Sequence, residues 1–324
     1  MEMGEKILAR NTDFTQGGKR EYSDGVITGY GTVDGRPIYI YSQDPQVLGG
    51  SLSEMHAEKI LRLYEMALRS GAPMIGLLDS VGLRIREGAD ALNAYGKLYR
   101  AQTKAKGRIP QIAGVFNNCG GGSVLMAGLC DFVFMENQAS LFVNPPATRT
   151  TDARRCDMLA ELSDQPAGRR LSDGKGTEDE ILGKIRRLIT YLPLTSEDLS
   201  PEEEPIDDLN RPARALQDGN TDPSSVILEI ADQDSVLELR RENCSEILLC
   251  FARFNGKTVG VAGNAGERTL TAEVCETMAD FVDFCSAFGI PVLTLTDTQG
   301  FSTDSCQEDQ MPTAAAYLLS VWAS

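Results

Sequence analysis

The chain carries the same pattern twice, and this repetition limits the folds that it can adopt. Residues 70–82 and residues 288–300 both contain a Gly-x-Pro opening, an apolar run and an Asp-x-x-Gly ending, at a constant offset of 218 positions. Repetition over such a distance is typical of a duplicated structural unit. We therefore expect two related units that are built from the same elements.

Each copy is predicted to contain a hairpin, a helix and a strand. Asp34-Gly35 and Asn255-Gly256 interrupt pairs of apolar stretches, as in β-hairpin turns. In the first copy a helix follows, with Ser51 and Glu54 as its capping box and Gly71 as its stop. The strands after the helices are almost continuously apolar, which is typical of buried parallel strands. The predicted hairpins are residues 26–32 with 37–41 and 248–254 with 257–262, the second helix ends at Gly289, and the later strands are 74–78 and 292–296.

The first copy continues through further predicted elements. A helix leads to a strand, a glycine-rich turn and an apolar helical run, and two short strands and a last helix follow. Strands that alternate with helices predict an α/β fold. The helix is predicted at 91–105, the strand at 111–116 and the glycine-rich turn at 120–122, with the apolar helical run continuing to Leu129. The two short strands are predicted at 132–135 and 140–143, and the last helix starts at Thr177.

The predicted domain organisation follows from the repeat and from an acidic segment between the copies. Carboxylates crowd residues 197–208 among prolines, which is typical of a solvated linker. Position 121 moved by 218 falls beyond Ser324, so we expect a truncated product, a fragment or one part of a split subunit. The predicted parts are an N-terminal extension at 1–23, an N-terminal domain at 24–195, an acidic linker at 196–235 and a partial C-terminal domain at 236–324.

Charge and composition argue against several classes of function. A formal net charge of −16 argues against nucleic acid as a partner, because phosphate binding needs a basic surface. No apolar run reaches the ~18 residues of a membrane helix, and residues 1–16 lack the apolar core of a signal peptide, which predicts a cytoplasmic protein. The eight cysteines include no Cys-x-x-Cys pair and His56 is the only histidine, so no metal site is predicted.

Gly120, Gly121 and Gly122 lie between a predicted strand and a predicted helix. Glycines there let backbone N–H groups bind an anion or stabilise an oxygen that becomes negative during a reaction, although a tight turn explains them equally well. Residues 80–88 follow the neighbouring strand, and such loops gather at one edge of a parallel sheet. We therefore predict that the two loops meet and supply the two donors of an oxyanion hole. Arg84 is a candidate for a phosphate contact, with an exposed ion pair as the alternative.

Ser123 follows the three glycines, and this order resembles the turns of serine hydrolases. The usual activating base of such a serine is a histidine. His56 lies on the first predicted helix, one step from its apolar stripe, where a structural role is expected. We therefore interpret Ser123 as a helix-capping residue.

Three segments, at residues 79–99, 109–135 and 281–301, together resemble the carboxyltransferase subunits of biotin-dependent acyl-CoA carboxylases and decarboxylases. The resemblance runs from about Asp24 to the end of the sequence. It implies tandem crotonase-like domains of the ClpP/crotonase superfamily, each built from ββα repeats, with the second domain incomplete. The implied reaction transfers CO2 between carboxybiotin on a biotin carboxyl carrier protein and the α-carbon of a short-chain acyl-CoA, through a thioester enolate.

The resemblance also implies where that enolate would be held. It places a first oxyanion hole at Gly121 and Gly122, faced by Gly82 and Leu83, with Gly120 and Arg84 as substrate-binding residues. For a second hole it implies Gly300 and Phe301 together with Ala315 and Ala316, which replace a glycine–alanine pair that opens a helix in the family. The implied partners are the biotin carrier, a dimer-based oligomer or a complementing C-terminal half, and indirectly a membrane decarboxylase complex.

Two other functions stay open at this point. A crotonase-type hydratase or isomerase needs a carboxylate as acid and base, and Glu87 is the nearest candidate. A catalytically silent scaffold that binds partner subunits is the second alternative. A ClpP-like protease is disfavoured, because no histidine follows Ser123.

Overall fold

The computed structural model describes residues 1–9, 22–144, 171–208, 210–214, 222–239, 247–264, 269–304 and 308–323. It divides the chain into two compact units, Met1–Arg186 and Arg187–Ser324. The finer domain bounds expected from the sequence, including the acidic linker at 196–235, stay predictions. No described helix is long and apolar enough to cross a membrane.

The first unit is built on one sheet of eight strands in the order β1-β2-β3-β4-β5-β6-β8, with β7 paired to β5. β2 and β3 form the predicted antiparallel hairpin, and the positive φ angles of Asp34 (51°) and Gly35 (78°) match a turn between twisted strands. From β3 onward the strands run parallel. The bounds are β1 Glu2–Met3, β2 Val26–Val33, β3 Arg36–Gln43, β4 Met74–Ser80, β5 Gln111–Gly120, β6 Phe132–Glu136, β7 Ser140–Phe142 and β8 Gly174–Gly176.

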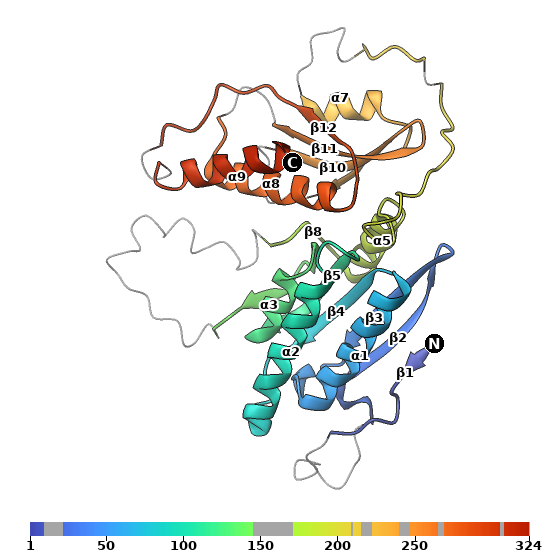
Figure 1. Ribbon diagram of the computed structural model, residues 1–324, viewed down its shortest axis with the longest axis vertical. Coiled ribbons are helices and arrows are strands. Elements are labelled where there is room, and N and C mark those ends of the chain that lie inside the picture. The colour runs from blue at the N-terminus through green and yellow to red at the C-terminus, as the bar shows by residue number, and fades with distance from the viewer. Residues whose placement is uncertain are drawn as a thin grey trace. The chain divides into compact units, whose positions relative to one another are not determined.

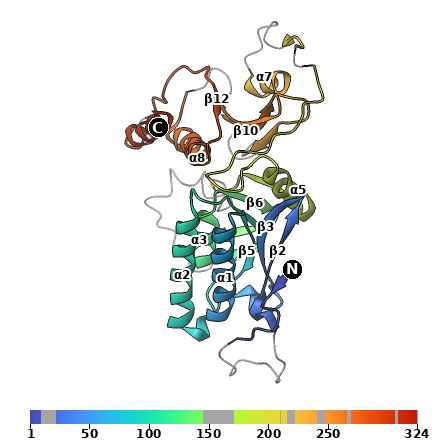
Figure 2. The same cartoon turned by 45° about the vertical axis from the view of Figure 1, so that its right-hand side comes forward.

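Helices cover both faces of this sheet (Figures 1 and 2). α1, α2 and α3 lie on one face, where Ala113 and Val115 of β5 join their buried residues in one core. α5 lies on the other face, with Ile185 beside Gly114. The bounds are α1 Glu54–Ser70, α2 Ala89–Ala105, α3 Gly122–Gly128 and α5 Glu178–Ile189. The α/β fold predicted from the alternation of elements is confirmed.

The start of α1 differs from the predicted capping box. Ser53, not Ser51, is the N-cap, and its hydroxyl accepts from the N–H of His56 at 3.0 Å. Ser51 lies two residues earlier, in extended backbone, and its buried hydroxyl accepts from Arg84 instead. The stop at Gly71 is confirmed, because this glycine takes the left-handed conformation (φ 64°) that favours glycine.

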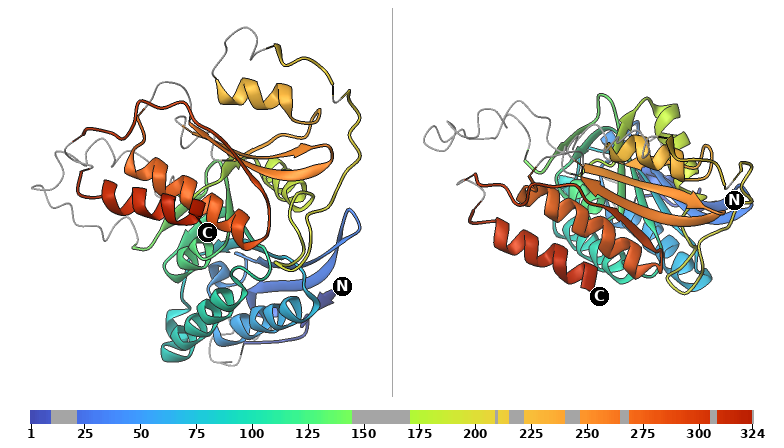
Figure 3. Two further views of the ribbon diagram at one scale, coloured as in Figure 1. Left: turned by 45° about the horizontal axis from the view of Figure 1, so that its top comes forward. Right: turned by 90° about the horizontal axis from the view of Figure 1, so that it is seen from above.

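The second unit contains a four-stranded sheet in the order β12-β11-β10-β9. α8 and α9 lie side by side on one face of it (Figure 3), and α7 covers the other face through Pro223, which lies against Gly263. The bounds are α7 Pro223–Ile230, β9 Leu237–Leu239, β10 Ile247–Phe254, β11 Lys257–Asn264, α8 Ala272–Ala287, β12 Val292–Leu295 and α9 Met311–Ala323.

The two units repeat the same backbone arrangement, as the sequence predicts. In the first unit Tyr39 pairs with Met74 and its N–H donates to Pro73 at 2.9 Å. In the second, Gly260 pairs with Val292 and its N–H donates to Pro291, also at 2.9 Å. The predicted burial is confirmed only for β4, since the residues of β12 are half-buried or exposed.

His56 is fully buried on α1 and has hydrogen-bond partners there. Its Nδ1 lies 3.1 Å from the backbone oxygen of Asp24, and its Nε2 lies 3.3 Å from Nε2 of Gln43. Burial, reinforced by the positive charge of Arg84, lowers the pKa of His56 to about 3. The structural role expected from the sequence agrees with this environment.

We expect the His56 imidazole to stay neutral down to about pH 4, because the folded state binds its proton only near its lowered pKa. The unfolded chain binds that proton near its ordinary pKa of 6.5, so this residue makes stability fall as pH decreases between these values. Since His56 is the only histidine, an NMR titration of imidazole protons measures it directly. A midpoint near 6.5 would contradict the buried position.

The partly buried carboxyl of Asp131 has the opposite effect on the pH dependence of stability. Burial raises the pKa of Asp131 to about 7, so it favours the folded state at low pH and loses that contribution as pH rises toward 7. The variant His56→Gln keeps Asp131 and removes the imidazole. The difference between its stability and that of the unaltered chain, followed over pH, therefore isolates His56.

Candidate functional site

The two glycine-containing loops of the first unit lie against each other. Ser80 at the end of β4 pairs with Cys119 of β5, and Leu52 forms a parallel bridge with Leu83. Gly82 has a φ of +108°, and a Cβ atom there would lie 3.0 Å from the carbonyl oxygen of Gly120. The predicted meeting of the two loops is confirmed, and it requires glycine at position 82.

The backbone hydrogen bonds decide which N–H groups remain available. The N–H of Gly82 donates to Oγ of Ser80 at 3.1 Å, and that of Gly121 donates to the carbonyl of Phe142 at 2.8 Å. Within the part of the chain that the structure describes, the N–H groups of Leu83 and Gly122 have no acceptor. The four residues predicted to face one another therefore supply one available donor from each loop.

Two tyrosines of α2 form hydrogen bonds to the glycine-rich turn and to the serine that follows it. The hydroxyl of Tyr99 donates to the carbonyl of Gly122 at 2.9 Å, and that of Tyr95 lies 2.9 Å from Oγ of Ser123. Burial raises the pKa of Tyr99 to about 12 and raises that of Tyr95 as well, so both hydroxyls keep their protons at neutral pH. A Cβ atom on Gly122 would lie 2.7 Å from the Tyr99 hydroxyl, which fixes this turn tightly.

Ser123 is not the cap of α3, and this part of the prediction is wrong. Gly121 is the N-cap, and Ser123 lies within the first turn of the helix, fully buried. Its hydroxyl is hydrogen-bonded to the hydroxyl of Tyr95, whereas the imidazole of His56 is hydrogen-bonded to Asp24 and Gln43. Among the described residues, Ser123 therefore has no histidine partner that would activate it.

Arg84 has a different environment from the one predicted. Its guanidinium is 6% exposed and lies 2.5 Å from the carboxylate of Asp24, which is 2% exposed. It also donates to the carbonyl of Ser51 at 3.0 Å and pairs with Glu87 at 3.4 Å. Arg84 is thus turned into the protein and fixes the loop that carries Leu83, whereas the sequence suggested a substrate phosphate or an exposed ion pair.

The sequence matches the Carboxyl transferase domain family over residues 1–311. The chain belongs to the carboxyl transferase domain family. It is 39% identical over 319 residues to the propionyl-CoA carboxylase beta chain of Cereibacter sphaeroides, covering 93% of this chain and 62% of the relative. It is 34% identical over 323 residues to the methylmalonyl-CoA decarboxylase subunit alpha of Veillonella parvula, covering 95% of this chain and 64% of that one.

Solved structures of carboxyl transferases share the whole fold. A transcarboxylase 12S crystal structure, a hexamer with methylmalonyl-CoA and methylmalonic acid bound, aligns with a TM-score of 0.89 at 27% identity. The alignment covers 100% of this chain and 66% of the 12S chain. The predicted family and the crotonase-like fold are confirmed, and this chain spans 62% of the first curated relative that it matches.

The second unit repeats the loop that carries Leu83. Leu270 bridges Phe301, the N–H of Gly300 donates to Oγ1 of Thr298 at 3.1 Å, and Gly300 has a φ of +116°. Phe301 is 49% exposed, and its N–H has no acceptor in the described ranges. Phe301 is therefore the counterpart of Leu83.

Ala315 and Ala316 do not open a helix, so the structure corrects that part of the expected second hole. α9 begins at Met311, and both alanines lie beyond its first turn. Their N–H groups belong to the internal hydrogen bonds of the helix, which run from residue i to residue i−4. They are consequently not available as donors next to Gly300 and Phe301.

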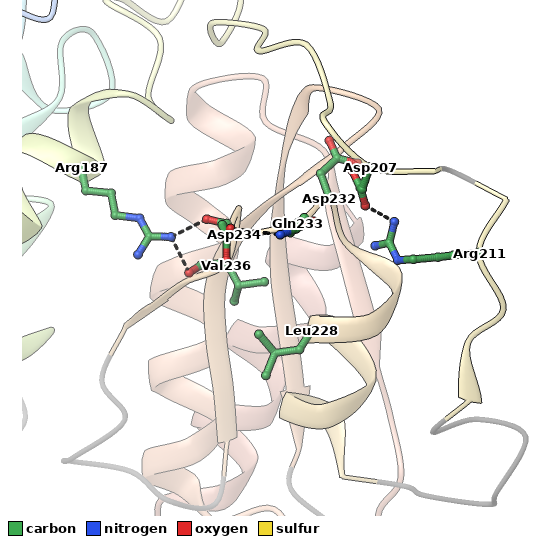
Figure 4. A pocket seen from close by; sticks show the side chains of 8 residues that line it. All are labelled: Arg187, Asp207, Arg211, Leu228, Asp232, Gln233, Asp234 and Val236. Atoms are coloured by element: carbon green, nitrogen blue, oxygen red, sulfur yellow. Dashed lines mark hydrogen bonds and ion pairs between the residues drawn. The ribbon is translucent and has the colours of Figure 1, made fainter.

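A pocket of 620 Å³ in the second unit is separate from the residues predicted to bind substrate (Figure 4). Arg187 donates to the carbonyls of Asp234 at 2.8 Å and Val236 at 3.0 Å, and Arg211 pairs with Asp207. These contacts hold the segment that leads into β9. The residues that line the pocket are Arg187, Asp207, Arg211, Leu228, Asp232, Gln233, Asp234 and Val236. Across the described ranges, no group of three or more His, Cys, Asp or Glu side chains could hold a metal ion.

Tyr95, Tyr99 and Asp24 were not among the predicted site residues. The tyrosines gave a usable signal, because residues four apart on a helix share a face, and α2 follows the loop of Leu83 directly. Asp24 gave none, since its pairing with Arg84 joins residues 60 positions apart.

Ser123→Ala is expected to leave any carboxyltransfer within about threefold of the unaltered chain, because Ser123 lacks an activating base. The free energy of unfolding should fall by about 1–2 kcal/mol, because the buried Tyr95 hydroxyl loses its partner. Urea denaturation and a turnover assay with methylmalonyl-CoA measure the two effects. A loss of turnover of about 100-fold at unchanged stability would instead identify Ser123 as a nucleophile.

Proposed function

We propose that this chain is a carboxyltransferase component that moves CO2 between carboxybiotin on a carrier protein and the α-carbon of a short-chain acyl-CoA. Membership of the carboxyl transferase domain family supports the reaction class. The names of its relatives, propionyl-CoA carboxylase beta chain and methylmalonyl-CoA decarboxylase subunit alpha, support propionyl-CoA or methylmalonyl-CoA as substrate and leave both directions open. We place the chain in an oligomer, as in the 12S hexamer.

The observation that carries the proposal is the pair of available N–H groups on facing loops, those of Leu83 and Gly122. The thioester oxygen takes the negative charge of an enolate when the α-carbon loses CO2, and, in the opposite direction, when the α-carbon loses a proton before it adds CO2. Two fixed donors stabilise such an oxygen more strongly than the neutral thioester, which lowers the barrier. Carboxybiotin supplies the activated CO2, and the chain contributes position and charge stabilisation.

The hydratase alternative receives less support from the geometry of Glu87. Its carboxylate accepts from the N–H of Glu54 at 2.9 Å and pairs with Arg84 at 3.4 Å. Its side chain is 6% exposed. An acid–base catalyst for a hydratase must reach the substrate and exchange a proton with it. Glu87 is instead part of the buried group that supports the Leu83 loop.

The direct test is binding and turnover of acyl-CoA thioesters by the purified chain. We expect methylmalonyl-CoA, malonyl-CoA or glutaconyl-CoA to bind at or below millimolar concentration by calorimetry, and release of CO2 to depend on added biotin or biotin carrier. Absence of binding at millimolar concentration would overturn the proposal and favour a scaffold. Turnover of crotonyl-CoA without biotin would support the hydratase.

A further inference from the structure

The pocket of the second unit has no part in the carboxyl transfer proposed above, and it has the size of a ligand site (Figure 4). Its volume of 620 Å³ lies within the roughly 300–1,000 Å³ of typical small-molecule pockets. All the residues that line it belong to Arg187–Ser324, so the second unit forms the pocket by itself. Charged side chains line it together with the aliphatic Leu228 and Val236, which favours a ligand that is both polar and apolar.

One wall of the pocket is held by Arg211 at the carboxyl end of α7. Its Nε donates to the carbonyl of Glu229 at 3.1 Å, its Nη2 donates to that of Ala231, and its Nη1 pairs with Oδ2 of Asp207. Basic side chains commonly bind the last carbonyls of a helix in this way. Every nitrogen of this guanidinium thus has a protein acceptor, and Arg211 fixes the position of the Asp207 carboxylate.

The other oxygen of that carboxylate lacks a donor. The side chain of Asp207 is 8% exposed, and its Oδ1 has no hydrogen-bond partner among the described residues. A buried carboxylate oxygen of this kind is costly, because it has lost its water without gaining a protein donor. Since Asp207 lines the pocket, a bound molecule can supply the missing donor.

Arg187 provides the complementary group on the other side of the pocket (Figure 4). Its Nη2 donates to the carbonyls of Asp234 at 2.8 Å and Val236 at 3.0 Å, which fixes the guanidinium. In the part of the chain that the structure describes, its Nε and Nη1 have no acceptor. These two nitrogens are suited to an anion such as a carboxylate.

The charges of the lining favour a cationic donor at Asp207. Three carboxylates and two guanidinium groups line the pocket, so one negative charge is in excess. Asp232 does not compete for the donor, because its two oxygens accept from the N–H groups of Asn255 at 2.9 Å and Gly256 at 2.7 Å. Asp234 is exposed to water. Asp207 is therefore the carboxylate that gains most from an ammonium group.

We propose that this pocket binds a linear ω-amino carboxylate, with its ammonium group at Oδ1 of Asp207 and its carboxylate at Arg187. The two ends must be separated, because the two side chains lie on different sides of the pocket with Leu228 between them (Figure 4). Leu228 is 62% exposed, and the methylene chain of the ligand covers it. This inference does not depend on the chemistry proposed above.

The probe is 6-aminohexanoate, titrated into the full chain by isothermal calorimetry. Hexanoate and hexylamine are the matched probes, because each keeps the methylene chain and only one of the two charged ends. We expect 6-aminohexanoate to bind at least about tenfold more tightly than either, since each charged end adds one charge-assisted hydrogen bond.

Asp207→Asn tests the ammonium end. The amide oxygen can still accept from Arg211, but an amide nitrogen that donates replaces the unpartnered oxygen. Binding of 6-aminohexanoate should weaken at least about tenfold, because its ammonium group loses its acceptor. Hexanoate does not use this end and should bind as it does to the unaltered chain, which shows that the pocket is intact.

Leu228→Gln tests the aliphatic part and keeps the test decisive if Asp207→Asn fails to fold. The exposed side chain of Leu228 can be replaced without disturbing the core, and binding of 6-aminohexanoate should weaken about threefold. Leu199→Gln is its control. Leu199 is 90% exposed in the same unit and does not line the pocket, so this variant should bind like the unaltered chain.

The proposal fails if 6-aminohexanoate does not bind at millimolar concentration. It also fails if Asp207→Asn, or Leu228→Gln where the first variant does not fold, binds the probe as tightly as the unaltered chain. Equal affinities for 6-aminohexanoate and hexylamine would show that Arg187 does not bind a carboxylate and would overturn the proposed ligand class.

Discussion

Gly82→Ala is expected to lower turnover of methylmalonyl-CoA by about 10² to 10³-fold, the usual effect of losing one oxyanion donor. The φ of +108° disfavours any side chain at this position, and the new Cβ atom would lie 3.0 Å from the Gly120 carbonyl oxygen. The loop must shift, and the N–H of Leu83 moves with it. Because the donor acts on the enolate, the effect should appear in kcat more than in KM.

Gly35→Ala is the matched control for backbone strain. Gly35 also has a positive φ, +78°, but no atom lies within 4 Å of the Cβ position, because it forms the turn between β2 and β3. Both variants should lose about 1–2 kcal/mol of stability from the left-handed backbone alone. Only Gly82→Ala should lose turnover. Equal losses of turnover in the two variants would contradict the role of the Leu83 loop as the carrier of an oxyanion donor.

Arg84→Met is expected to lower the free energy of unfolding by about 3–5 kcal/mol, the usual cost of leaving one member of a buried ion pair alone. The carboxylate of Asp24 would stay in a site where its side chain is 2% exposed, without the guanidinium that now lies 2.5 Å away. Urea denaturation of the purified variant measures this effect. Arg84→Met combined with Asp24→Asn should recover much of the loss.

Arg186→Met provides the comparison at the surface of the same unit. Arg186 pairs with Asp34 through side chains that are 65% and 41% exposed, and breaking such an exposed pair should leave the stability almost unchanged. If Arg84→Met proves as mild as Arg186→Met, the buried group of Asp24, Arg84 and Glu87 does not support the loop as we describe it.

The arrangement of strands and helices was predictable because it depends on spacing. The offset of 218 between Gly82 and Gly300, and the turns at Asp34-Gly35 and Asn255-Gly256, can be read directly from the sequence. The structure places the two glycines in equivalent positions, and it does the same for the two turns. The family resemblance rested on the same segments. These features need no knowledge of which residues touch across the fold.

The direction of individual N–H groups could not be predicted from the sequence. The N–H of Gly121 is occupied because Phe142, on the strand β7 that follows α3 and β6, presents its carbonyl there. Arg84 turns inward because Asp24 lies beneath it, and the choice of Ser53 over Ser51 as cap follows from the same buried group. Each outcome depends on a tertiary partner far away in the sequence, which local patterns do not encode.

The amide protons of Leu83 and Gly122, followed while propionyl-CoA binds, test the proposed oxyanion hole directly. The chain, labelled with ¹⁵N-leucine and ¹⁵N-glycine, should show downfield shifts of these two amide protons as the thioester oxygen accepts from them. The amides of Gly82 and Gly121 already donate to Ser80 and Phe142, so they should shift less. If Leu83 and Gly122 stay unshifted at saturation with propionyl-CoA, their N–H groups do not form the oxyanion hole.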